Sequence, residues 1–352
     1  MGKKLTCIDS FSGAGGLSIG LKDAGFKMLY AFDNNASAVE SYNHFFPGNH
    51  CEVMDAREIT GEFILKKIKL SAGEELDLFA GGPPCQGFSR QRRGAESGAD
   101  KRNELVIEYA RIVSELHPKA FMLENVDMLG LARGAKYFKH VENRLQDYDL
   151  YPHFYNSADY GVPQTRVRFI TVGIRKDLNV KFEIPSPTVD KWLTVGEVLA
   201  GLPEPPADYS VHPDFFNHQN ARVTKENIFR FSFVPQGGGW ADIPFEHRLP
   251  CHQRVNTKKG GWPDTFGRLS WEGQCPTITG GFDSFTRGRY GHPLHDRPLT
   301  PREAARIQGF PDDFMFCGNR GEVRKQIGNA VPPPLAQAIG KAIIKAIKSG
   351  SK

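Results

Sequence analysis

The chain has 352 residues, of which 39% are hydrophobic and 24% are charged, enough apolar material for one large domain or two smaller ones. No run of about 18 uncharged apolar residues occurs, so a membrane-spanning helix is not expected, and the six cysteines lack the paired short spacing of a zinc site, which suits the reducing cytoplasm. The net charge of +5 leans towards a polyanionic partner without identifying one.

Short apolar runs alternate with helical patterns over the first half of the chain. Strands are predicted over residues 5–9, 27–33, 51–54, 76–80 and 119–125, and helices over 17–25, 104–117 and 136–148. This alternation predicts an α/β fold with a doubly wound, mostly parallel sheet. Two further runs, 151–160 and 166–174, are separated by the turn-rich GVPQT and predict an antiparallel pair at the edge of the sheet.

The pattern changes after about residue 182, where Gly, Pro, His and aromatic residues become frequent and long periodic segments stop. Residues 221–300 hold 11 Lys and Arg against 7 Asp and Glu, so most of the positive excess lies there. Helical patterns return at 300–309, which Thr300 and Pro301 start, and at 332–347. We predict a first domain over 1–182, a second, smaller and irregular domain over 183–317, and a C-terminal segment, 318–352, that returns to the first domain.

A glycine-rich turn joins the first predicted strand to the first predicted helix. Gly13, Gly15 and Gly16 let backbone N–H groups and the helix N-terminus approach a ligand closely. Asp33 ends the second strand, where a carboxylate accepts bonds from ribose hydroxyls, and Asp55 follows the third strand, within reach of an adenine amine. The turn alone is a common structural device, and it lacks the third glycine of the dinucleotide fingerprint. Together with the two carboxylates it favours an adenosine cofactor without a pyrophosphate, such as S-adenosylmethionine.

Cys85 follows the fourth predicted strand in the stretch GGPPCQGFS. Two prolines stiffen the backbone before it, and Arg90, Arg92 and Arg93 follow it, so the local charge favours the reactive thiolate. A lone cysteine is more often a small buried hydrophobe. The stiff, basic surroundings favour a nucleophile instead.

Glu124 and two arginines complete a set of groups that suits one reaction. Glu124 ends the next strand after Phe, Met and Leu, which favours a desolvated, protonated carboxyl group. Arg166 and Arg168 alternate along a predicted strand and so share one face, where such pairs are usually solvent-exposed. A thiolate that adds to C6 of cytosine makes C5 nucleophilic, while a proton given to N3 and hydrogen bonds to O2 stabilise the adduct. These residues therefore favour methylation of cytosine at C5.

The same residues lie in motifs that resemble those of the DNA (cytosine-5)-methyltransferases, particularly the bacterial restriction-modification enzymes. FSGAGG, GGPPCQGFS, ENV, QTRVRF, LTPREAARIQGFPDDF and QIGNAVPPPLAQAI occur in the family's order, over roughly residues 5–175 and 265–345. The resemblance implies the Rossmann-like fold of S-adenosylmethionine-dependent methyltransferases. It also implies transfer of a methyl group to C5 of a flipped-out cytosine within a specific double-stranded DNA sequence, through a covalent intermediate between Cys85 and C6.

The resemblance implies roles residue by residue. Cys85 matches the nucleophile, Glu124 the acid that meets N3, Arg168 the arginine that contacts O2, and Arg166 the first arginine of the same motif. The first domain is then the catalytic and cofactor-binding domain. Cofactor contacts are implied for Phe11, Gly13, Gly15, Gly16, Asp33, Asp55, Leu105 and Asn329.

Double-stranded DNA is the partner that the resemblance implies, with no membrane and no metal. Residues 89–102 resemble the family's mobile loop over DNA, and the second domain, unmatched over about 185–275, corresponds to the target recognition domain. DNA contacts are expected from Gln86, Ser89, Arg90, Arg92, Arg93, Arg254, Arg268 and Arg287. A cognate restriction endonuclease as genetic partner, a monomeric state and a cytoplasmic location are further expectations. The recognition sequence is not readable from the chain.

Three other interpretations compete with this one. A tRNA cytosine methyltransferase of the same family would keep the chemistry, but its Cys-Phe-Thr tripeptide is absent and the basic segment 221–300 suits a duplex. A non-enzymatic DNA-binding relative would be expected to have lost Cys85, Glu124 or the arginines, and all are present. An NAD oxidoreductase would explain the sheet, but neither the glycine spacing nor the surroundings of Cys85.

Overall fold

The computed structural model describes residues 4–48, 51–71, 73–84, 104–126, 134–255 and 264–350. Contacts divide the chain into two compact units, of which the first comprises Met1–Tyr160, Val167–Thr188 and Val331–Lys352. The second comprises Gly161–Arg166 and Val189–Ala330. The domain boundaries at 182/183 and 317/318 stay predictions.

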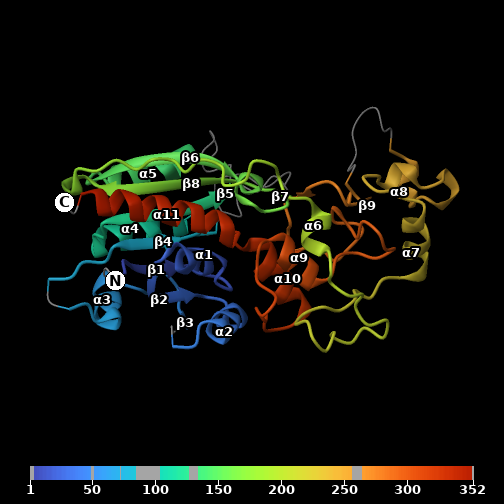
Figure 1. The fold of residues 1–352 in the computed structure, drawn as a ribbon, viewed down its shortest axis with the longest axis horizontal. Coiled ribbons are helices and arrows are strands. Elements are labelled where there is room, and N and C mark those ends of the chain that lie inside the picture. The colour runs from blue at the N-terminus through green and yellow to red at the C-terminus, as the bar shows by residue number, and fades with distance from the viewer. Residues whose placement is uncertain are drawn as a thin grey trace. The chain divides into compact units, whose positions relative to one another are not determined.

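A seven-stranded sheet in the order β3-β2-β1-β4-β5-β8-β6 forms the centre of the first unit (Figure 1). Its strands are β1 (Thr6–Ser10), β2 (Lys27–Asp33), β3 (Cys51–Val53), β4 (Leu78–Gly81), β5 (Ala120–Val126), β6 (Tyr148–Asn156) and β8 (Val167–Arg175). Every neighbouring pair is parallel except those of β8, which runs antiparallel to β5 and β6. The mostly parallel sheet and its antiparallel edge pair are therefore confirmed. The strand order reverses between β1 and β4, and ligands of such sheets bind outside the carboxyl ends of the strands at that point.

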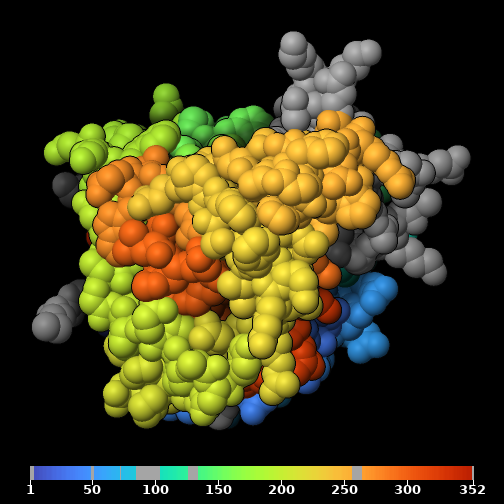
Figure 2. Space-filling view, turned by 90° about the vertical axis from the view of Figure 1, so that its right-hand side faces the viewer, coloured from blue at the N-terminus to red at the C-terminus, as the bar shows by residue number. Residues whose placement is uncertain are grey.

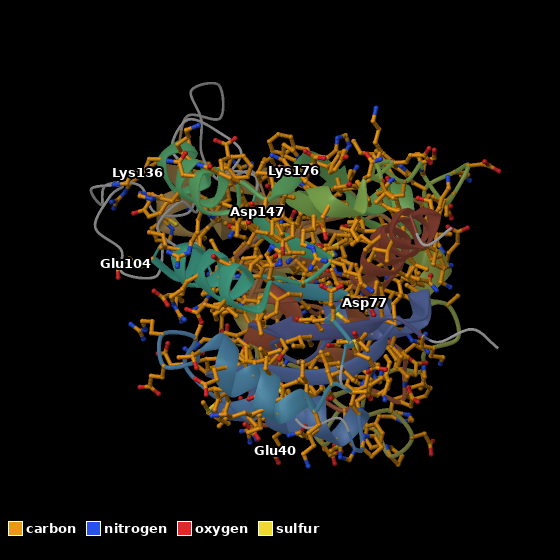
Figure 3. The ribbon with its side chains drawn as sticks, turned by 90° about the vertical axis from the view of Figure 1, so that its left-hand side faces the viewer. Glu40, Asp77, Glu104, Lys136, Asp147 and Lys176 are labelled. Atoms are coloured by element: carbon orange, nitrogen blue, oxygen red, sulfur yellow. The ribbon has the colours of Figure 1, made fainter. Side chains whose placement is uncertain are left out.

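Helices cover both faces of this sheet because alternate strand residues face opposite ways. Ile8 and Phe79 belong to one apolar cluster, with residues of α3 (Gly61–Ile68), α4 (Leu105–Leu116) and α5 (Ala135–Arg144). Cys7 and Leu78 belong to the other, with residues of α1 (Gly16–Ala24) and α11 (Pro333–Ser349). Figure 3 shows α3 and α4 to one side of the strands and α11 to the other. A further helix, α2 (Ala36–Phe45), follows β2.

The last helix packs closely on the first. A Cβ atom placed on Gly20 of α1 would lie 2.2 Å from the carbonyl oxygen of Pro333 and 2.5 Å from Cβ of Ala336. Glycine at position 20 therefore permits the two helices to approach. Leu335 and Ile339 of α11 are fully buried in the cluster that also contains strand residues, so the apolar face of this helix finds its partner in the first unit.

The second unit consists of short elements joined by long loops. They are β7 (Gln164–Thr165), α6 (Val195–Leu199), α7 (Lys225–Ser232), α8 (Pro250–Gln253), β9 (Gly267–Arg268), β10 (Cys275–Pro276), β11 (Arg289–Gly291), α9 (Pro301–Ile307) and α10 (Arg320–Asn329). Figure 2 looks onto this unit from the side of α7 and α8, coloured yellow to gold. Its own apolar cluster includes Phe231, Trp240 and Phe285. The helix start predicted at Thr300 is confirmed, since its hydroxyl accepts from the Glu303 N–H in a capping box.

Candidate active site

The glycine turn lies between the carboxyl end of β1 and the start of α1. Gly15 has φ +96°, and a Cβ atom there would lie 2.8 Å from Cδ2 of Tyr42, so both the backbone and the space require glycine. Gly13 has φ +52°, and a Cβ atom there would meet no described atom within 4 Å. Phe11 also has a positive φ of 53°, and its ring centroid lies 6.1 Å from that of Phe32. The turn is thus held firmly on its Tyr42 side and open at Gly13.

Asp33 at the end of β2 faces this turn. Its Oδ2 accepts the Gly13 N–H at 2.9 Å, and its Oδ1 accepts the Asn35 N–H at 2.8 Å. Burial raises the pKa of Asp33 above the usual carboxyl range, while the hydrogen bonds from Gly13 and Asn35 oppose that shift. An acceptor beside an open glycine turn fits the ribose hydroxyls of an adenosine cofactor.

Three other residues predicted to contact a cofactor lie in different surroundings. The carboxylate of Asp55 is bound by the guanidinium of Arg57, whose hydrogen bond lowers the pKa of Asp55. Leu105 is the first residue of α4 and is buried in the apolar cluster with Phe79. Asn329 is the exposed last residue of α10, in the second unit. Their contact with a cofactor stays a prediction.

Asp9 is a buried acid beneath the turn that the sequence analysis did not single out. Its Oδ2 accepts the Ser18 hydroxyl at 2.6 Å, and that hydroxyl lies 3.0 Å from the hydroxyl of Tyr42. Its Oδ1 is buried without a hydrogen-bond partner among the described residues, and burial raises the pKa of Asp9 to about 7. The signal in the sequence was an acid within a predicted apolar strand, because acids without a partner are rarely buried.

Glu124 and Arg168 meet on neighbouring strands beyond β4. Val126 of β5 pairs with Arg168 of β8, and the Arg168 Nε lies 3.2 Å from the Glu124 Oε1. Their side chains are only 10% and 13% exposed for Glu124 and Arg168, respectively, so the pair is largely shielded from water. The guanidinium is a hydrogen-bond donor, and the carboxyl group can give up a proton only in its protonated form, so the pair can serve adjacent atoms of one small ring in that form.

The segment that follows β4 and leads to Cys85 in the sequence contacts Glu124 and its neighbour Asn125. A Cβ atom on Gly82 would lie 2.8 Å from the Glu124 Oε2, so a larger residue at position 82 would displace that carboxylate. The Asn125 side chain donates to the carbonyl of Pro83 at 2.9 Å, two residues before Cys85. Cys85 itself lies outside the described residues, as do Gln86, Ser89, Arg90, Arg92 and Arg93.

The predicted alternation of Arg166 and Arg168 along one strand is wrong. β7 ends at Thr165 and β8 begins at Val167, so Arg166 lies outside both strands. Its buried guanidinium donates to the carbonyls of Ile278, Gly328 and Ala330 at 3.0–3.1 Å, all in the second unit. Alternation of faces holds only within a continuous strand. Arg166 thus joins β7 to the end of α10.

Arg268 does not match the predicted DNA-contacting role. It is 4% exposed, and its guanidinium donates to the carbonyls of Phe231, Val234, His292 and His295 and to the carboxylate of Asp296. An arginine has five N–H donors, and all five are used here, so none is left for a phosphate. Arg254 and Arg287 are exposed, and their contacts with DNA stay predictions.

One group in the described residues has the composition of a metal site. Ligand atoms of Glu204, His292 and His295 lie within 4.8 Å of one another. Glu204 already receives His295 Nε2 at 2.9 Å and the guanidinium of Arg297 at 3.1 Å, and Nδ1 of His292 accepts two backbone N–H groups at 3.2 Å. A guanidinium opposes a second cation, so the geometry is that of a hydrogen-bonded network. The prediction of no metal stays untested.

Comparisons with known proteins agree across nearly the whole chain. The family described as C-5 cytosine-specific DNA methylase matches residues 5–345. The chain is 33% identical to Type II methyltransferase M1.HphI of Haemophilus parahaemolyticus over 97% of this chain and 87% of that protein. It is 35% identical to Type II methyltransferase M.BbvI of Brevibacillus brevis over 95% and 89%.

Solved structures share the fold. An E. coli prophage protein described as a DNA modification methyltransferase superposes with a TM-score of 0.74 at 28% identity, over 98% of this chain and 100% of the other. The Entamoeba histolytica methyltransferase EhMeth superposes with a TM-score of 0.65 at 16% identity, over 98% and 99%, which shows the fold alone. Among the described residues, no helix combines the length and apolar character needed to span a bilayer.

Proposed function

The chain belongs to the C-5 cytosine-specific DNA methylase family and is a DNA cytosine-5-methyltransferase of the restriction-modification type, and we propose that it acts through a covalent bond between Cys85 and C6 of a flipped-out cytosine. The observation that carries the proposal is the buried pair of Glu124 and Arg168, beside the backbone that leads to Cys85. The base is reached on both faces of its ring, which stacking in a duplex prevents, so it must leave the helix.

The proposed roles follow the order of bond changes. The Cys85 thiolate adds to C6, and the protonated carboxyl group of Glu124 gives its proton to N3, so that no net charge builds up on the ring. Arg168 donates to O2 and stabilises the same adduct. After methylation, N3 returns its proton to the carboxylate of Glu124, and loss of the C5 proton to water restores the double bond and expels the thiolate of Cys85.

The cofactor site we propose lies at the glycine turn. The open side of Gly13 and the carboxylate of Asp33 fit the adenosine part of S-adenosylmethionine, and Phe11, Gly15, Gly16, Asp55, Leu105 and Asn329 are the further contacts we propose. When bound, this cofactor supplies an electrophilic methyl group that C5 of the adduct can attack. The relatives carry Type II methyltransferase names, so we also propose a cognate endonuclease as genetic partner.

A trapping experiment tests this mechanism. Bisulfite sequencing of plasmid DNA from expressing cells first identifies the methylated cytosine. A duplex with 5-fluorocytosine at that position, given S-adenosylmethionine, should then form a stable adduct, because fluorine at C5 blocks the last elimination. Peptide mapping should find the DNA on Cys85, and Cys85→Ala should form no adduct and no methylcytosine while still binding DNA. Full turnover by Cys85→Ala, or an adduct on another residue, would refute the proposal.

A further inference from the structure

A hollow in the second unit carries an unusual concentration of arginines. Its volume is about 570 Å³, within the usual range of ligand pockets. Segments around residues 209–227, 283–287 and 320–324 line it. Its charged residues among those described are Arg222, Arg287, Arg320, Arg324 and a single acid, Asp283. The lining therefore has an excess of positive charge.

The acid is already bound to two of these arginines. Asp283, whose side chain is 3% exposed, accepts Arg320 Nε at 2.6 Å and Arg324 Nη1 at 2.9 Å. One carboxylate thus faces two guanidinium groups, which leaves one positive charge uncompensated. In addition, Arg320 Nη2 and Arg324 Nε are buried without a hydrogen-bond partner among the described residues. Uncompensated positive charge is costly in a partly buried place, and an anion in the hollow reduces that cost.

The other two arginines line the same hollow and are exposed. Arg222 and Arg287 are exposed, and neither forms an ion pair with a described residue. The guanidinium of Arg222 lies 5.4 Å from the ring centroid of Tyr209, which limits its orientations. Guanidinium groups bind phosphate through two parallel hydrogen bonds, so this arrangement favours a phosphate over an apolar ligand.

We propose that the hollow binds a phosphodiester group of the DNA backbone and so positions the duplex without reading its sequence. This inference rests on the proposed function, because it takes DNA as the substrate. Contacts to phosphate fix the register of a protein on DNA, whereas base edges carry the sequence. The volume exceeds that of one phosphate group and leaves room for the attached sugar.

The salt dependence of binding tests this inference. Equilibrium binding is measured without S-adenosylmethionine on a duplex with the target sequence and on a scrambled duplex, over about 50 to 200 mM salt. The double variant Arg222→Ala/Arg287→Ala should reduce the slope of log affinity against log salt by about 1, because one phosphate is no longer neutralised. Both duplexes should lose affinity by the same factor. The exposed Arg144 of the first unit supplies the matched control, Arg144→Ala, which should leave the slope unchanged.

Further measurements make each outcome decisive. Arg222→Lys/Arg287→Lys keeps both charges and should keep most of the slope. An unchanged slope in the alanine variant, or a loss of affinity confined to the target duplex, would overturn the inference. It would also be overturned if inorganic phosphate at constant ionic strength stabilised the protein against unfolding while the alanine variant kept its slope. A changed slope without a 5-fluorocytosine adduct would refute only the proposed mechanism, and an adduct with an unchanged slope would refute only the phosphate site.

Discussion

Nε of Arg168 lies 3.2 Å from Oε1 of Glu124, and both side chains are largely shielded from water. The two residues are brought together by the antiparallel register of β5 and β8, in which Val126 pairs with Arg168. The arginine reaches its contact from the one strand that runs against its neighbours, whereas the glycine turn and Asp33 stand on parallel strands. The reversed strand is therefore what places a guanidinium beside the acid.

Glu124→Gln should lower turnover by about 100-fold or more, because a general acid contributes roughly two to four orders of magnitude. The affinity for S-adenosylmethionine should change little, since the described contacts of Glu124 involve the β4–β5–β8 side of the site and not the glycine turn. Steady-state kinetics and calorimetric titration measure the two quantities. Glu40→Gln, an exposed glutamate on α2 (Figure 3), is the matched control and should change neither. Equal losses of turnover and of cofactor affinity would indicate a structural role for Glu124.

Asp33→Asn should weaken S-adenosylmethionine binding by about 10- to 100-fold, because a hydrogen bond to a charged acceptor is worth roughly 1.5–3 kcal/mol. The substitution also weakens the acceptor of the Gly13 N–H, which holds the glycine turn. Turnover at saturating cofactor should fall much less. Titration of the cofactor with Asp33→Asn and with the exposed control Asp23→Asn gives the comparison. If both variants bound the cofactor as tightly as the unaltered protein, Asp33 would not be a ribose acceptor.

Arg268→Ala should destabilise the protein by about 3 kcal/mol or more, since it removes a buried side chain and leaves four carbonyls and the exposed acid Asp296 without their donor. Arg268→Lys should also destabilise it, because a lysine has three donors for five acceptors. Urea unfolding of both variants measures this, with the exposed Arg254→Ala as control. Unchanged stability together with weaker DNA binding would contradict the structural role and restore the original prediction.

The fold was largely predictable because its strands are short apolar runs bounded by glycine and polar residues. The predicted strand at 27–33 matches β2, and the antiparallel pair at the edge matches β6 and β8. Helix α2 was missed because only Ala38, Val39, Ser41 and Tyr42 among its residues are buried, which leaves a weak helical periodicity. Its start depends instead on the Asn35 side chain, which caps the Ala38 N–H.

The positions of site residues were predictable where their motifs lie at strand ends. They were not predictable where contacts between distant parts of the sequence determine a side chain's partners. Glu124, Asp33 and the glycine turn lie at the carboxyl ends of strands, as parallel-sheet topology requires. Arg268 is a basic residue in a basic segment, as expected of a DNA contact. Its acceptors, however, belong to residues 24 to 37 positions away in the sequence. No local pattern reports such partners. Arg166 likewise finds acceptors more than 100 positions away.

The buried carboxyl group of Asp9 should make the free energy of unfolding depend on pH, and a variant can isolate its contribution. Burial raises the pKa of Asp9 from its ordinary value of 3.8 to about 7. Between these values the folded protein keeps a proton that the unfolded chain has released, so this stability is lost as the pH rises through about 7. Above that pH the folded state must hold a buried carboxylate whose Oδ1 has no partner among the described residues.

Asp9→Asn removes this titration while keeping an acceptor for the Ser18 hydroxyl. The free energy of unfolding of the variant relative to the unaltered protein should therefore rise by about 3 kcal/mol between about pH 5 and pH 8, at 1.36 kcal/mol per pKa unit. Other groups cancel in this difference, including His292, whose pKa burial lowers to about 4. Urea unfolding at the two pH values measures it, with Asp23→Asn as the exposed control. A difference that stayed constant with pH would show that Asp9 titrates alike in the folded and unfolded chains.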